Sequence, residues 1–175
     1  VKTVQKDGYL QMTLNGDPLW FSGFRARRAT QRDRAYRDGN YRIFLYGVSM
    51  GGSDGSNSGR TWLGPGRYEF SAIEDGLERF FKTYPETKIV ITYGIDAPRW
   101  WILANPDECV WFEGKSSPEG LTSLASKKWR KEGRDAFRAF VRHFEKSKFA
   151  SRIIGSLPKN LQNITVCLTA LRFAR

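Results

Sequence analysis

The chain has 175 residues and a mass of 20.1 kDa, and its 29 Lys and Arg residues against 18 Asp and Glu residues give a net charge of +11. A hydrophobic fraction of 40% can form a core, which argues against a disordered chain and against a disulfide-stapled miniprotein. The longest apolar runs are far shorter than the ~20 residues of a membrane-spanning helix, so we expect a soluble protein with no membrane partner.

Few residues are available for metal or triad chemistry. Cys109 and Cys167 form no disulfide or zinc-binding pattern, and the single His143 lies among basic residues, where a surface or packing role is expected. We therefore expect no metal site and no cofactor. No apolar leader follows Val1, and the earlier removal of a leader, with secretion, stays open.

The first third of the chain predicts a hairpin and a buried strand. Asn15-Gly16 separates two apolar runs, which is typical of a β-hairpin because both turn positions tolerate a positive φ. A short polar helix is predicted within 26–38, and a β-branched and aromatic strand over 41–48. The Gly-rich and Ser-rich segment 51–66 predicts a long loop.

The middle of the chain predicts a helix followed by a second strand. Ser71-Ala72-Ile73-Glu74 has the pattern of a capping box, and apolar residues then recur at spacings of three and four until Pro85. Residues 88–93 predict a buried strand, and a further long loop is expected to run to Leu121.

A long helix is predicted over 123–147, and a third buried strand from Arg152. Buried strands that alternate with amphipathic helices indicate an α/β fold with a parallel sheet and right-handed crossovers. Such sheets place binding sites at the carboxyl ends of their strands. The segments 49–67 and 96–121 and the residues after Gly155 should therefore share one rim.

Five of the six tryptophans lie in these rim segments or at the start of the long helix. Flat apolar rings suit the C–H faces of sugars, and carboxylate or amide oxygens can bind sugar hydroxyls. The alternative is that the rings only pack the loops onto the rim, and that the acidic residue after the second buried strand only holds its loop. The predicted sugar-binding residues are Trp62, Asp96, Trp100, Trp101, Asn105 and Trp129.

Four segments resemble the amino-terminal half of β-galactosidase-like glycoside hydrolases, retaining enzymes of the (β/α)8 barrel clan near family 42. They are Trp-Leu-Gly-Pro-Gly-Arg-Tyr-Glu-Phe-Ser-Ala-Ile-Glu at 62–74, Asp-Ala-Pro-Arg-Trp-Trp at 96–101, Asn-Pro-Asp-Glu at 105–108 and Ser-Leu-Ala-Ser-Lys-Lys-Trp-Arg at 123–130. The resemblance covers residues 8–155. It implies that the single domain 1–175 is a partial TIM barrel, about the first four β/α units preceded by a β-hairpin, with an atypical tail over 156–175.

Retaining hydrolysis needs an acid/base carboxyl group and a nucleophilic carboxylate about 5–5.5 Å apart. In the family that the chain resembles, the acid/base glutamate follows the fourth strand, usually after an asparagine, and the nucleophile ends the seventh strand. Here Leu161 follows Asn160, and no Asp or Glu occurs after Glu145. We therefore expect a truncated hydrolase for β-galactosides or related β-linked sugars, inactive alone, with no catalytic residue in this chain.

Two alternatives stay open. The first is a carbohydrate-binding module without chemistry. The second is a basic nucleic-acid-binding domain, using the cations of 25–34 and 127–134; it is less favoured because a solvated basic surface also explains a pI near 9.9. An incomplete barrel would also leave sheet edges open, which favours self-association.

Overall fold

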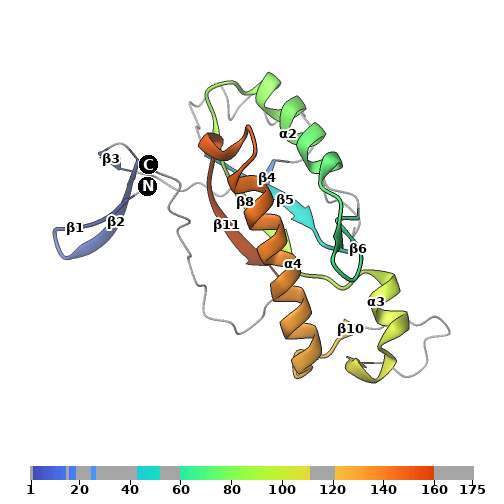
Figure 1. Ribbon diagram of the computed structural model, residues 1–175. Helices are drawn as coiled ribbons and strands as arrows, with labels where there is room; N and C mark the ends of the chain where they lie inside the picture. Colours follow the sequence, from blue (N-terminus) through green and yellow to red (C-terminus); the bar gives the residue numbers. More distant parts are fainter. Residues whose placement is uncertain are drawn as a thin grey trace.

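The computed structural model in Figure 1 describes residues 2–14, 16–18, 25–26, 43–51, 60–110 and 121–159. Most of the predicted 26–38 helix, Trp111 and the tail after residue 159 lie outside the described residues. The described part is a mixed α/β structure with a parallel sheet.

The N-terminal strands form a small antiparallel sheet in the order β1-β2-β3, with β1 over Lys2–Lys6, β2 over Tyr9–Leu14 and β3 over Asp17–Pro18. The β2–β3 pair is the hairpin predicted around Asn15-Gly16. The β1–β2 hairpin was not predicted, although Asp7-Gly8 marks its turn. Both turn residues have positive φ, 51° and 82°, as a two-residue hairpin turn requires.

The main sheet contains four parallel strands, and they lie side by side in their order along the chain (Figure 1). They are β4 (Arg25–Ala26), β5 (Ile43–Ser49), β8 (Lys88–Gly94) and β11 (Ile153–Lys159). The three buried strands predicted from β-branched and aromatic residues are thus confirmed, and β4 is an addition. The described strands form an open sheet and contain no closed barrel.

Helices α2 (Ser71–Thr83) and α4 (Lys127–Glu145) cover the same face of this sheet. Phe80 of α2 contacts Tyr46 of β5, with ring centroids 5.7 Å apart, and Phe140 of α4 contacts Tyr93 of β8 at 4.5 Å. Val48 of β5 pairs with Tyr93, and Val48 points to the same side as Tyr46 because side chains alternate along a strand. Both helices therefore pack on one layer of aromatic side chains.

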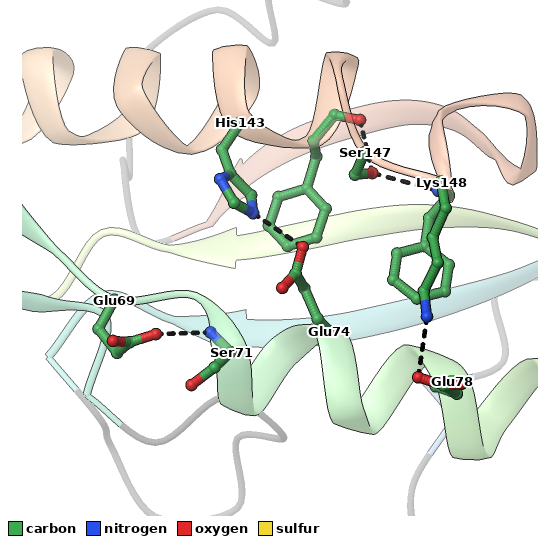
Figure 2. Close-up of polar contacts among 9 residues, drawn as sticks. Glu69, Ser71, Glu74, Glu78, His143, Ser147 and Lys148 are labelled. Carbon is green, nitrogen blue, oxygen red and sulfur yellow. Dashed lines mark hydrogen bonds and ion pairs between the residues drawn. The ribbon is translucent and has the colours of Figure 1, made fainter.

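Two polar contacts join α2 to the end of α4 and the segment after it, as Figure 2 shows. The His143 imidazole lies 3.0 Å from the Glu74 carboxylate, and the Lys148 ammonium lies 3.0 Å from that of Glu78. All four side chains are substantially exposed, so each pair contributes little stability. The contacts do show that the two helices are neighbours.

The remaining elements are short. A β-hairpin begins inside the predicted 51–66 loop and ends just after it. Its turn contains Gly66, which has a φ of 65°. The short elements are β6 (Trp62–Gly64), β7 (Arg67–Tyr68), α3 (Arg99–Ala104), η1 (Pro106–Glu108), β9 (Cys109–Val110), β10 (Leu121–Thr122) and η2 (Ala150–Arg152). No helix of the described ranges is long and apolar enough to cross a membrane.

The start of α2 corrects one prediction. The helix begins at Ser71, as expected, but Phe70 is the N-cap residue and no side chain caps it, so the capping box is wrong. The Glu69 carboxylate instead accepts a hydrogen bond of 2.8 Å from the Ser71 amide (Figure 2), and Glu74 pairs with His143. A carboxylate near the start of a helix also interacts favourably with the positive end of the helix dipole.

This arrangement predicts acid sensitivity at the start of α2. The Ser71 hydrogen bonds lower the pKa of the Glu69 carboxyl below its ordinary value. Its contribution to stability is therefore present above the unfolded-state pKa and is lost as the pH falls through the folded-state pKa. We expect Glu69→Gln to lower the melting temperature at pH 7 and to bring it closer to that of the wild type at pH 3.

The control is Glu86→Gln, which removes an exposed carboxylate from the turn after α2. It should leave the melting temperature near that of the wild type at both pH values. Equal behaviour of the two variants would contradict the role assigned to Glu69.

Candidate functional site

The candidate site lies where the carboxyl ends of β5 and β8 meet. Ser49 and Gly94, the last residues of the two strands, are register partners, and Asp96 follows two residues after Gly94. The Ser49 hydroxyl donates to both Asp96 carboxylate oxygens, at 2.8 and 2.7 Å, and the Gly51 amide donates to one of them at 3.2 Å. Asp96 therefore ties together the chain segments that leave the two strands.

Two glycines make room for this carboxylate. A Cβ atom on Gly51 would lie 2.7 Å from the nearer Asp96 oxygen and 2.9 Å from the Ala97 carbonyl oxygen. A Cβ atom on Gly94 would lie 3.0 Å from the other Asp96 oxygen. Limited space, and not a left-handed backbone, favours glycine at both positions, since neither residue has a positive φ.

A buried layer of hydroxyl groups supports the site. The Thr61 hydroxyl lies 3.2 Å from the Met50 carbonyl oxygen and 3.2 Å from the Tyr93 hydroxyl. Burial raises the pKa of Tyr93 far above its ordinary value, and it raises the pKa of Tyr46 on the neighbouring strand to about 12. Both phenols are therefore neutral near pH 7, so this layer positions the loops and offers no base.

The predicted tryptophans form one packed cluster. The Trp62 ring centroid lies 5.0 Å from that of Trp100 and 6.2 Å from that of Trp129, and Trp101 lies 4.9 Å from Trp129. The exposed fraction is 3% for Trp62, 0% for Trp101 and 2% for Trp129, whereas Trp100 is half-buried. The first three rings cannot present a face to a sugar in this arrangement.

Hydrogen bonds hold the cluster in place. The Trp100 indole N–H donates to the Trp62 carbonyl oxygen at 2.9 Å, and the Trp101 indole N–H donates to a Glu132 carboxylate oxygen at 2.6 Å. The Trp62 indole N–H is buried and has no hydrogen-bond partner among the residues that the structure describes. This cluster joins β6, α3 and α4. Trp62, Trp101 and Trp129 therefore pack the loops onto the rim, as the alternative to sugar binding expected.

Asn105 serves the turn between α3 and η1. Its amide N–H donates to the Trp101 carbonyl oxygen at 2.8 Å, and its side-chain oxygen accepts from the Lys128 ammonium. The Cys109 thiol donates to the Asn105 backbone carbonyl oxygen at 3.3 Å, and burial raises the pKa of that thiol. Asn105 thus fixes the loop, and the raised pKa makes the Cys109 thiol less reactive than an ordinary one.

Among the described residues, the hydrogen bonds of the site centre on one carboxylate, that of Asp96. Within the described ranges, no group of three His, Cys, Asp or Glu side chains could hold a metal ion. His143 contacts the first turn of α2 and the Phe70 ring, 4.8 Å away, so it does not assist Asp96. What remains is one half-buried carboxylate at a strand end, which can accept hydrogen bonds from a ligand.

The position of Asp96 at a strand end was predicted from the sequence, whereas the residues that it contacts there were not. Ser49, Gly51 and Thr61 carry no motif, and each reaches the site through a contact that is distant along the chain. Their one signal is position, because all three fall within the segment 49–67 that was expected on the rim.

No known protein family, curated protein or solved structure matches this chain. The likeness to galactosidase-like hydrolases therefore rests on the four quoted segments.

We predict that Gly51→Ala disturbs the site because its methyl group meets Asp96 and the Ala97 carbonyl. Overpacking of this kind costs about 1–3 kcal/mol of the free energy of unfolding. Gly64→Ala is the matched control, since its Cβ atom would meet nothing closer than 3.8 Å. Urea unfolding followed by tryptophan fluorescence measures both. A Gly51→Ala variant as stable as Gly64→Ala would contradict the tight fit.

Proposed function

We propose that this chain is the first part of the barrel of a retaining, β-galactosidase-like glycoside hydrolase and that it contributes sugar contacts without the catalytic carboxylates. The observation that carries the proposal is the main sheet. Its described strands β4, β5, β8 and β11 are parallel and stay in chain order, and α2 and α4 cover one face. This is how consecutive units of a (β/α)8 barrel are arranged.

The second face of the sheet agrees with the proposal. Leu45 of β5 and Val90 of β8 are register partners, and alternation turns both away from the helices. Branched apolar side chains of this kind fill the interior of such barrels. A doubly wound sheet would instead carry helices on both faces and reverse its strand order.

Asp96 is the side chain that we propose as the sugar contact. An ionised carboxylate offers about four acceptor positions, so the Ser49 and Gly51 hydrogen bonds leave capacity for a hydroxyl group. Asp96 is half-buried and lies at the carboxyl end of β8, the position of substrate contacts in barrel enzymes. Trp100, the half-buried ring of the cluster, is the candidate for apolar contact.

Catalysis would require groups from outside the described part. The acidic residues of the sequence end at Glu145, before β11, whereas the family's two catalytic carboxylates follow the fourth and seventh strands. The burial of Trp62, Trp101 and Trp129 also weighs against the alternative of a binding module built on stacked rings. The four-unit barrel therefore explains more of the structure than that alternative does.

The first test measures sugar binding by saturation-transfer NMR with methyl β-D-galactoside. We expect weak, saturable binding, lost in Asp96→Asn because a neutral amide accepts fewer and weaker hydrogen bonds. Asp107→Asn is the control, since it changes an exposed acid on η1. A circular dichroism melt checks that both variants fold. Absence of binding, or equal binding by both variants, would contradict the assignment of Asp96.

The second test addresses the class of enzyme. The coding DNA after codon 175, read in three frames, should contain an Asn-Glu pair and a later glutamate from the missing strands. The chain alone should release no nitrophenol from 4-nitrophenyl β-D-galactoside. Hydrolysis by this chain, or no such glutamates in any frame, would contradict the proposal.

A partial barrel would leave the two edges of its sheet unpaired, so we expect it to self-associate. In the described sheet, β4 and β11 each have one neighbouring strand. Unpaired backbone groups at such edges favour association with a second copy. Sedimentation velocity at several concentrations should reveal dimers or larger species, and a monomer at every concentration would count against open edges.

A further inference from the structure

The outer face of α4 carries a continuous basic stripe. Its five members recur at spacings of three and four residues, which places them on one side of a helix. All five side chains are exposed, and they lie opposite the buried face formed by Trp129, Phe140 and Phe144. The members of the basic stripe are Lys127, Lys131, Arg134, Arg138 and Arg142.

Little acidic charge offsets the stripe. Asp135 lies within ion-pair distance of Lys131, Arg134 and Arg138, at 3.4, 3.9 and 3.6 Å, so three cations share one carboxylate. The other acidic residues of α4 are Glu132, which bonds to the Trp101 indole, and Glu145, at the last position of the helix. The stripe therefore keeps a net positive charge along most of its length.

At the amino-terminal end of α4 this pattern opposes the stability of the helix. The first turn of α4 contains basic residues and no acidic one, which is unfavourable near the positive end of the helix dipole. Cations at spacings of three and four residues also repel one another. The chain keeps this charge pattern although it departs from the local preferences of the helix, which points to a role for the cations outside the fold.

We infer that the basic stripe binds the sugar-phosphate backbone of a nucleic-acid duplex, without regard to its base sequence. From Lys127 to Arg142 the stripe rises about 22 Å at ~1.5 Å per residue, which equals the axial rise of about six base pairs at ~3.4 Å each. Several cations can thus contact phosphates at once. The inference is independent of the proposed glycosidase function, because it uses the helix face that points away from the sheet.

The side chains of α4 favour a duplex over a single strand. Binding of single strands relies on aromatic rings that stack on bases, and the Trp and Phe side chains of α4 are buried or half-buried. Phosphate contacts alone position a protein and carry no sequence information.

The experiment measures fluorescence anisotropy of a labelled 20-base-pair duplex of mixed sequence between 50 and 200 mM salt. The test variant is Lys131→Gln/Arg134→Gln/Arg138→Gln, and the control is Arg67→Gln/Arg79→Gln/Lys82→Gln, which removes as much charge from exposed positions elsewhere. We expect the test variant to lose about tenfold or more in affinity at 100 mM salt. Its slope of log affinity against log salt should fall by about 2 to 3, at ~0.9 per phosphate contact.

A second variant makes the opposite change. Asp135→Asn removes the carboxylate that three stripe cations share, so it should bind the duplex more tightly than the wild type. The inference is overturned if the wild type does not bind at 50 mM salt, if both triple variants weaken binding equally, or if Asp135→Asn does not strengthen it. Binding to phosphatidylserine vesicles without binding to the duplex would also overturn it.

Discussion

β5 and β8 pair in parallel over seven residues, from Ile43 opposite Lys88 to Ser49 opposite Gly94. This register decides which side chains face the helices, because residues that pair across a parallel ladder point to the same side. It also brings the carboxyl ends of both strands to one edge. The Asp96 hydrogen bonds to Ser49 and Gly51, and the packing of α2 beside α4, both depend on it.

The aromatic cluster changes the interpretation of the rim. Tryptophans at strand ends suit both sugar stacking and loop packing, and burial decides between the two. With Trp101 at 0% and Trp129 at 2% exposure, these rings contribute core area, and their loss would cost about 3–5 kcal/mol of stability each. The sugar contact that we propose is therefore the polar one at Asp96 and not a stack on a buried ring.

The two faces of helix α4 differ in chemistry. Its inner face packs against Tyr93 and Trp101, and its outer face gathers the cations of the basic stripe. A charge pattern that weakens the isolated helix is tolerated because the buried aromatic face stabilises it. The outer face is therefore available for a partner without affecting the core.

Local patterns in the sequence were sufficient to predict β5, β8, β11, α2 and α4, and hence an α/β arrangement with a parallel sheet. Periodicity and β-branched runs act over a few residues, so the sequence displays them directly. The position of Asp96 at a strand end was predictable for the same reason. The Asp-Gly turn of β1–β2 was also readable and was overlooked.

Tertiary structure alone decided what these residues do. Asp96 meets Ser49 across 47 positions, and Glu74 leaves its predicted capping role for His143, 69 positions away. Trp62, Trp101 and Trp129 became core because segments distant along the chain cover their faces. Such contacts depend on how elements pack and not on neighbours in sequence. The sequence by itself therefore determined the main strands and helices, and the packing determined the site.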